Sequence, residues 1–182
     1  NANEHDLHRA LSNAYAINRG ERLGYIFPII TSANALQVDG QNDNGWDQGL
    51  LFMDSSKAWL QPCGYTTQMA RSAHLPCLAD WDVEGDAEGL DITAASSEDG
   101  GKAAVKLVNL IGEDRTAVIR IEGQDGGRRA TVTVMTADSV LDANPAEDVD
   151  HVKPVSRTET VPAEGLALAV PAYSYVTVVT ES

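Results

Sequence analysis

Apolar residues near the start of the chain recur at three- and four-residue steps, the spacing of one helix face. The members of this face are Leu7, Ala10, Leu11, Ala14, Ile17 and Leu23. Asp6 or Asn3 is suited to cap the helix start, because a short polar side chain accepts a hydrogen bond from the first turn. Gly20 or Gly24 is suited to end it, because glycine adopts the left-handed conformation without strain. We therefore predict an amphipathic helix over residues 6–22.

Two short apolar runs and a second helix follow. Residues 25–30 are apolar apart from Pro28, which predicts a short strand covered on both faces, as parallel strands are. Pro28 argues against a central place in a sheet, because it cannot donate to the ladder. A polar turn at residues 42–45 precedes a second strand-length run at residues 49–53, and Pro62 suits the first turn of a helix extending to about residue 73. The pattern predicts a helix–strand–helix arrangement.

The pattern changes after Pro76, where short strand-like runs alternate with turns. Val105, Leu107 and Asn109 show period-two alternation, and the glycine-rich segments 98–101 and 124–127 are typical of hairpins. No helical period separates the runs, which predicts an antiparallel β-sandwich, jelly-roll-like in its connections. Residues 137–155 are too long and polar for a hairpin turn and are expected to form a surface loop. The strand-like runs are residues 78–83, 90–95, 103–111, 116–122, 130–137, 156–161, 166–170 and 173–180.

Composition excludes several classes of partner. The 182 residues suffice for one domain plus part of another, and 43% of them are hydrophobic, as in ordinary globular proteins. A formal net charge of −14 argues against nucleic acid and anionic membrane surfaces, because both bind through Lys and Arg. No apolar run reaches the roughly 18 residues of a membrane helix, and no signal peptide opens the chain. The protein is therefore expected either in the cytoplasm or, with an upstream signal, outside the cell.

No cofactor and no metal ion is expected. Cys63 and Cys77 lack metal-binding spacing, and two buried small side chains are favoured over a disulfide or a metal site. The acidic alternation at residues 80–88 lacks the central glycine and terminal glutamate of a calcium loop, so a solvated strand edge is favoured. The four histidines do not share a ligand spacing that points to a metal site.

Two blocks of sequence resemble a known enzyme family. The first reads Trp46-x-Gln48-Gly49-Leu50-Leu51-x-x-Asp54, followed by Pro62-x-x-Tyr65-x-x-Gln68-Met69. It resembles the end of the catalytic barrel of the family 51 glycoside hydrolases, the α-L-arabinofuranosidases. The second is similar to the pattern that closes the C-terminal β-domain of that family, and comprises residues 137–145, 152–155 and 168–174. The two blocks occur in the family's order, and the resemblance extends from Asp6 to Thr180.

The resemblance implies a mainly β fold in two parts. Residues 1–76 would be the C-terminal remnant of a (β/α)8 catalytic barrel, and residues 77–182 the C-terminal β-sandwich domain. The helix at residues 6–22 would follow the seventh barrel strand, and residues 25–36 would form the eighth strand and its loop. Glu21 and Arg22 match an acidic-basic pair of the family, and for Glu21 a surface or helix-end ion pair is favoured over a catalytic role.

The family hydrolyses glycosides with retention through two glutamates, at the ends of the fourth and seventh barrel strands. Both would precede Asn1, so we assign no catalytic residue and expect the chain alone to be inactive. Gln48 matches a glutamine that hydrogen-bonds the arabinofuranose, and an amide suits that role because it both donates and accepts. A plain loop-capping role for Gln48 is equally favoured. Trp46 would either stack on a sugar or, as the favoured alternative, fill the barrel mouth.

Two classes of function follow. The first is the C-terminal domain of an α-L-arabinofuranosidase that releases terminal arabinofuranosyl residues from arabinose-containing plant polysaccharides, with this domain bracing the barrel. The alternative is a non-catalytic structural or carbohydrate-binding β-sandwich, although its aromatic residues, Trp81, Tyr173 and Tyr175, make a poor binding platform. The apolar residues 7–17 and 25–30 would lack their barrel partners, so we expect them to fold onto the sandwich or to pair with a second copy in a homo-oligomer.

Overall fold

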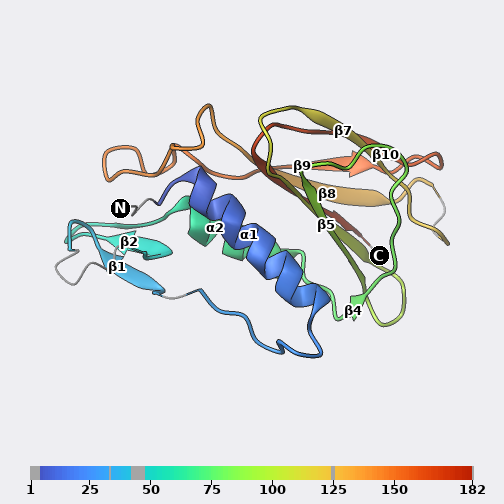
Figure 1. Ribbon diagram of the computed structural model, residues 1–182, viewed down its shortest axis with the longest axis horizontal. Helices are drawn as coiled ribbons and strands as arrows, with labels where there is room; N and C mark the ends of the chain where they lie inside the picture. The colour runs from blue at the N-terminus through green and yellow to red at the C-terminus, as the bar shows by residue number, and fades with distance from the viewer. Residues whose placement is uncertain (1–4, 33, 42–47, 124–125, 182) are drawn as a thin grey trace.

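The structure, a computed structural model, describes residues 5–32, 34–41, 48–123 and 126–181. Helices α1 (Leu7–Arg22) and α2 (Pro62–Ser72) lie side by side between a small three-stranded sheet and a β-sandwich (Figure 1). In the described part of the chain no helix is long and apolar enough to cross a membrane. The mainly β fold class, an antiparallel sandwich preceded by a helical and mixed segment, is confirmed.

Helix α1 has the predicted range and N-terminal cap, but its C-terminal cap differs from the prediction. Asp6 Oδ1 accepts a hydrogen bond from the backbone N–H of Arg9 at 2.9 Å, which caps the first turn. At the other end the C-cap is Leu23, and neither Gly20 nor Gly24 has a positive φ, so the predicted glycine cap is wrong. Gly20 has another role: a Cβ there would lie 1.8 Å from Ile30 Cδ1, so glycine leaves room for the Ile30 side chain.

The three-stranded sheet has the order β1-β2-β3. Strand β1 (Leu36–Val38) is parallel to β2 (Leu51–Met53), which is antiparallel to β3 (Ala58–Leu60). The predicted strand at residues 25–30 is wrong. That segment has no ladder partner, and Tyr25 and Ile29 are 84% and 79% exposed. Without a neighbouring strand its backbone has no ladder to join, so its apolar pattern alone does not form a strand.

The sandwich consists of a six-stranded antiparallel sheet and a two-stranded one. The order of the larger sheet is β4-β5-β6-β11-β8-β9, and β7 pairs with β10 in the smaller sheet. The 98–101 hairpin is confirmed, because it joins the paired strands β5 and β6. The 124–127 hairpin is wrong, because β7 and β8 belong to different sheets. The strands are β4 (Cys77–Leu78), β5 (Leu90–Ser96), β6 (Ala103–Asn109), β7 (Arg115–Ile119), β8 (Arg129–Met135), β9 (Val155–Thr160), β10 (Leu166–Val170) and β11 (Ser174–Thr180).

The two faces of the six-stranded sheet contribute to separate cores. Adjacent residues of β11, Tyr175 and Val176, belong to different cores because successive strand residues point to opposite faces. The sandwich core lies between the two sheets and contains Leu107, Ala130, Val132, Leu166, Leu168, Val170, Val176 and Val178. The helix-side core joins α1 and α2 to the sheet and contains Leu7, Ala10, Leu11, Ala14, Cys63, Met69, Val108, Met135, Val152 and Tyr175. The N-terminal segment thus folds onto the sandwich.

The loop between β8 and β9, residues 136–154, also joins the two parts; we call it the clasp loop. It extends over the N-terminal end of α1 (Figure 1). There the backbone N–H groups of Leu7 and His8 donate to the carbonyl oxygens of Asp142 and Val140 at 2.9 and 2.8 Å. These carbonyls satisfy donors that the first turn of a helix leaves without intrahelical partners. The expectation of a simple surface loop is therefore incomplete.

Asn144 fixes the centre of the clasp loop and is fully buried. Its Nδ2 donates to the carbonyl oxygens of Leu60 and Val152 at 2.8 and 2.9 Å, and its Oδ1 accepts from the Val152 N–H at 2.6 Å. The Asn144 carbonyl in turn accepts from Trp59 Nε1 and Gln61 Nε2, each at 2.8 Å. Both the side chain and the main chain of Asn144 thus tie the clasp loop to the segment that leads into α2.

Candidate functional site

Of the two predicted sugar-contacting residues, Gln48 can be located. Trp46 lies outside the described residues. Gln48 lies just before β2 with an exposed side chain, while its main-chain carbonyl accepts a hydrogen bond from Arg9 Nη2 of α1 at 2.9 Å. The structure therefore combines a solvent-accessible amide with an anchored main chain.

The residues after Gln48 are fixed against the segment that forms β1. Gly49 is buried, and a Cβ at this position would come within 2.3 Å of Gln37 Cβ, so only glycine allows this approach. The N–H groups of Leu50 and Leu51 donate to the carbonyls of Asn34 and Ala35 at 3.1 and 3.0 Å. An amide held in this way can donate to and accept from the hydroxyl groups of a ligand, but it supplies no acid or base for catalysis.

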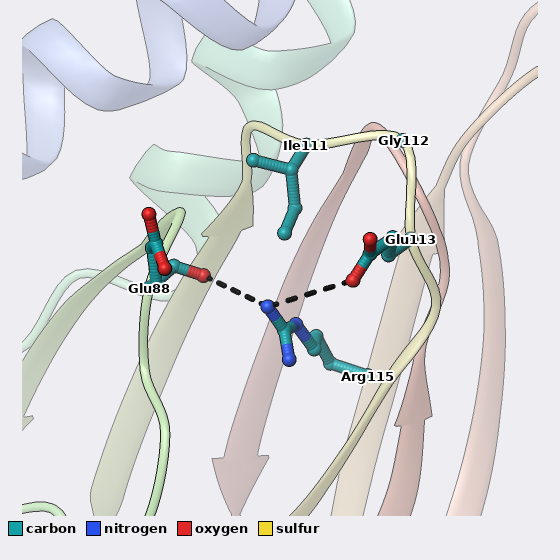
Figure 2. A pocket seen from close by; sticks show the side chains of 5 residues that line it. All are labelled: Glu88, Ile111, Gly112, Glu113 and Arg115. Carbon is teal, nitrogen blue, oxygen red and sulfur yellow. Dashed lines mark hydrogen bonds and ion pairs between the residues drawn. The ribbon is translucent and has the colours of Figure 1, made fainter.

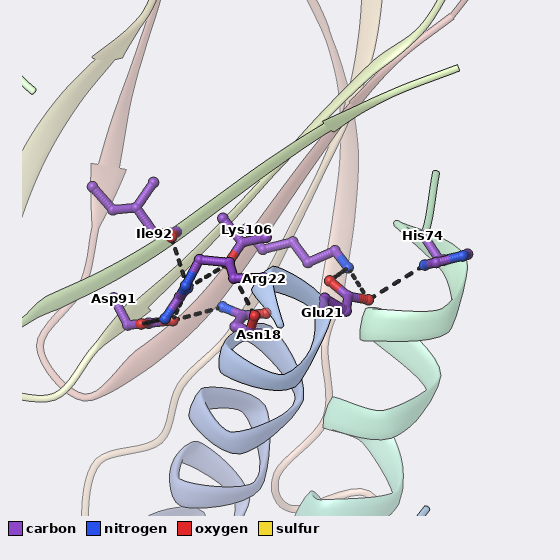
Figure 3. A network of polar contacts seen from close by, with 8 residues as sticks. Asn18, Glu21, Arg22, His74, Asp91, Ile92 and Lys106 are labelled. Atoms are coloured by element: carbon purple, nitrogen blue, oxygen red, sulfur yellow. Dashed lines mark hydrogen bonds and ion pairs between the residues drawn. The ribbon is translucent and has the colours of Figure 1, made fainter. Parts of the chain in front are cut away.

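Glu21 takes part in a polar contact with the sandwich (Figure 3). Lys106 Nζ of β6 donates to Glu21 Oε1 at 2.6 Å, and the Lys106 side chain is only 1% exposed. His74 Nδ1 lies 3.4 Å from Glu21 Oε1 on the other side. Burial lowers the pKa of Lys106, and the Glu21 carboxylate opposes that shift. The ion pair favoured for Glu21 is present, and it joins the helix to the sandwich.

Arg22 makes a parallel contact one residue later (Figure 3). Its Nη2 lies 2.5 Å from Asp91 Oδ1, and its Nη1 donates to Asp91 Oδ2 at 3.1 Å and to the Ile92 carbonyl at 2.8 Å. Asn18 Nδ2 donates to Asp91 Oδ2 at 3.1 Å. Glu21 and Arg22 each bind an opposite charge on the sandwich. Cation and carboxylate saturate each other in both pairs, which suits docking better than proton transfer.

A pocket of about 400 Å³ lies on the sandwich and was not predicted (Figure 2). Arg115 occupies its centre: its Nη2 lies 3.8 Å from Glu113 Oε2 and donates to the Glu88 carbonyl at 3.4 Å. Asp86 contributes a further carboxylate oxygen, 3.2 Å from Arg115 Nη1. The pocket brings together two separate chain segments, at residue 88 and at residues 111–115, so sequence spacing could not reveal it. The acidic alternation at residues 80–88 was the one signal, because it contains Asp86 and Glu88.

Both cysteines of the chain lie among the described residues. Both cysteines are free thiols, Cys63 buried and Cys77 half-buried. Burial raises the pKa of the Cys63 thiol to about 11, so it stays protonated and unreactive near neutral pH. Nowhere in the described ranges do three His, Cys, Asp or Glu side chains come together as a metal site would require.

Comparison with known proteins identifies relatives of the fold. No family model and no curated protein matches the chain. An α-L-arabinofuranosidase from Thermotoga maritima, solved with arabinose, matches with a TM-score of 0.82 at 22% identity, over 97% of this chain and 39% of that one. A thermostable GH51 α-L-arabinofuranosidase from Thermotoga petrophila RKU-1 matches with a TM-score of 0.80 at 21% identity, over 97% of this chain and 38% of that one.

A neighbour from another glycosidase family shares the architecture less closely. The catalytic domain of GH30 xylanase C from Talaromyces cellulolyticus matches with a TM-score of 0.63 at 17% identity, over 100% of this chain and 36% of that one. The chain thus spans between 36% and 39% of the length of these three structures. At these identities the likeness concerns the fold. The chain has the fold of the C-terminal portion of the family 51 α-L-arabinofuranosidases.

Proposed function

We propose that this chain is the C-terminal portion of an α-L-arabinofuranosidase, a retaining glycoside hydrolase that releases terminal arabinofuranosyl residues from arabinose-containing plant polysaccharides. The main support is the fold match over 97% of this chain but only 39% of the Thermotoga maritima enzyme. The motif around Gln48 and the pattern in the clasp loop support the same family. Arabinan, arabinoxylan and the jelly-roll connectivity remain predictions within this proposal.

In this proposal the chain contributes to sugar binding while other residues perform the chemistry. Retaining hydrolysis needs a protonated and an ionised carboxyl group roughly 5 Å apart. The described acids Glu21 and Asp91 are bound by Lys106 and Arg22, and we assign neither a catalytic role. The two glutamates would come from the barrel residues that precede this chain, whereas Gln48 would offer its amide to the sugar hydroxyls.

Exposed apolar side chains in residues 25–30 support the proposal that a further part of the protein, or a second copy, covers this segment. Ile26 and Phe27 are 54% and 51% exposed, beside the still more exposed Tyr25 and Ile29. Neighbouring apolar residues of this size are seldom left bare in a monomer. The remainder of a barrel would cover residues 25–30, and β1 has a free edge in the sheet order of the described residues. A second copy of the chain is the alternative cover and would produce the predicted homo-oligomer.

The decisive experiment compares this chain with the same chain extended upstream by its own genomic sequence. Hydrolysis of 4-nitrophenyl α-L-arabinofuranoside by the extended form alone would support the proposal and show that this portion is inactive by itself. The proposal fails if the upstream sequence encodes no barrel, or if a folded extended form leaves the substrate intact. Light scattering on the extended form distinguishes cover by the barrel, which gives a monomer, from cover by a second copy.

A non-catalytic carbohydrate-binding or structural role is the alternative. Trp81 is 47% exposed and Tyr173, which precedes β11, is 38% exposed, so two aromatic rings are available on the sandwich. The third aromatic, Tyr175, is fully buried. Retardation of this chain in gels containing arabinoxylan, lost in Trp81→Ala, would favour that alternative. The likeness to a GH30 xylanase makes xylan the second polymer to include.

A further inference from the structure

Arg9 connects the exposed amide of Gln48 to the body of the protein. The residue lies in the first turn of α1, where its backbone N–H is held by the Asp6 cap. Its side chain reaches across 39 positions of sequence to the Gln48 carbonyl, with Nη2 at 2.9 Å from that oxygen. A guanidinium is planar and presents its donors in a fixed fork, so this contact restrains direction as well as distance.

The helix that bears Arg9 is itself fixed to the sandwich. Leu7 and Ala10 on either side of Arg9 are fully buried in the helix-side core. The clasp loop accepts hydrogen bonds from the Leu7 and His8 N–H groups through its carbonyls. A continuous series of contacts therefore joins the clasp loop, the first turn of α1, Arg9 and the Gln48 main chain.

The environment of Arg9 favours a positional role over a stabilising one. Its Nη1 is buried and has no hydrogen-bond partner within the described part of the chain. An unsatisfied buried donor opposes folding, so fold stability alone gives little reason for a guanidinium at this position. The contact it does make is directed at the residue before the tightly packed Gly49, where a small rotation of the main chain would redirect the Gln48 side chain.

We propose that Arg9 is a positioning residue for Gln48. Docked on the sandwich through α1 and the clasp loop, its guanidinium fixes the Gln48 carbonyl and so sets the direction in which the amide meets the sugar. This inference rests on the proposed function for the identity of the ligand, but not for the contact itself. It gives the sandwich a part in substrate affinity as well as in support of the barrel.

The contact can be tested in this chain without any ligand. Amide hydrogen exchange would be compared for the wild type, Arg9→Met, Arg9→Lys and the control Arg19→Met, which alters an exposed arginine on the same helix. We expect the amides of Leu50 and Leu51 to exchange at least tenfold faster in Arg9→Met, with β5 and β6 unchanged. Arg9→Lys should restore part of the protection, because an ammonium can still donate. Two results for Arg9→Met would overturn the inference: faster exchange throughout the chain, or an exchange rate at Leu50 equal to that of the wild type.

The consequence for sugar binding is tested in the upstream-extended enzyme. We expect kcat/KM for 4-nitrophenyl α-L-arabinofuranoside to fall about tenfold in Arg9→Met, mainly through KM. Gln48→Ala should give a similar loss, and the double variant should lose no more than either single one, because both act through the same amide. Additive losses, or wild-type KM in Arg9→Met, would refute the positioning role. An inactive extended wild type would refute the proposed function instead, while the exchange experiment would still decide the contact.

Discussion

The two halves of α1 bind the same sheet by different means. Near its start the helix buries Leu7, Ala10 and Leu11 in the helix-side core. Near its end it presents Glu21 and Arg22, which bind charges on the sheet. The sheet shows the same division. On one face of β6, Val108 contributes to the apolar contact, and Lys106, two residues earlier, contributes to the ionic one.

The difference separates stability from orientation. Apolar contacts are non-directional and scale with the area removed from water, so they favour docking without specifying one angle. A buried ion pair adds little net stability compared with apolar residues of the same shape, but a misplaced charge left unpaired there is costly. We infer that the first half of α1 supplies most of the docking free energy, and that Glu21 and Arg22 select one orientation.

The largest effect is expected in the apolar half. Leu7→Ala should lower the free energy of unfolding by about 3 kcal/mol, because a fully buried leucine loses its contacts and leaves a cavity. Urea unfolding followed by circular dichroism measures the change. Ser12→Ala on the exposed face of α1 is the matched control and should stay within about 0.5 kcal/mol. A loss of under 1 kcal/mol for Leu7→Ala would contradict the comparison.

The ionic half should be sensitive to removal of one charge and tolerant of removal of both. Lys106→Met should cost about 2 kcal/mol, less than a fully buried pair would, because Glu21 keeps 18% exposure and contact with His74. Adding Glu21→Gln should recover most of the loss, because no unpaired carboxylate then remains. Urea unfolding of the two single variants and the double variant tests this. A double variant as unstable as the sum of the singles would show that the two side chains are not coupled, and would contradict the prediction.

Alkaline pH should weaken the apolar half through Cys63. Burial raises the pKa of this thiol from 9.0 to about 11, so between these values the unfolded state loses its proton before the folded state does. Stability therefore falls as pH rises through this window, by about 2 kcal/mol at pH 10.5. Cys63→Ala should remove that part of the decline in unfolding experiments at pH 8 and pH 10.5. If Cys63→Ala lost as much stability between pH 8 and pH 10.5 as the wild type, ionisation of Cys63 would not be the cause of the loss.

The smallest predicted effect has the opposite sign and belongs to Lys106. Burial holds its pKa below 10.5, so in the window beneath that value the unfolded state binds more protons and stability rises with pH. Lys106→Met should therefore show a steeper alkaline decline than the wild type. Burial also raises the pKa of Tyr175, but that group is present in both proteins and cancels in their difference. Parallel pH profiles would contradict the prediction.

Local periodicity was sufficient for the helix and for much of the sandwich. The run at residues 166–170 coincides with β10, and the helix predicted over residues 6–22 is α1 with its Asp6 cap. Periodicity failed at residues 25–30, where the apolar pattern is that of a strand but no described strand pairs with the segment. It also missed β1 and β3, whose three residues each are too few to show a period.

The candidate site depended on contacts that no local pattern reveals. Gln48 was identified through family resemblance, but its link to Arg9 joins segments 39 positions apart. Asp91 and Lys106 alternate with apolar neighbours and therefore resemble solvent-facing strand positions, yet both are buried because α1 covers them. Their burial follows from the docking of a distant helix, which is a tertiary effect that sequence spacing does not encode.

The hydrogen bonds between the first turn of α1 and the clasp loop also affect how the protein is made. Leu7 is synthesised long before Asp142, its backbone partner. At about 5–20 residues per second, translation separates the two by roughly 7 s or more. During that interval the first turn of α1 lacks the carbonyl partners of the clasp loop, and its buried face lacks the Val152 side chain that covers it. We therefore expect a nascent chain stalled before residue 140 to bind hydrophobic-surface chaperones, and a chain released after residue 180 to escape them.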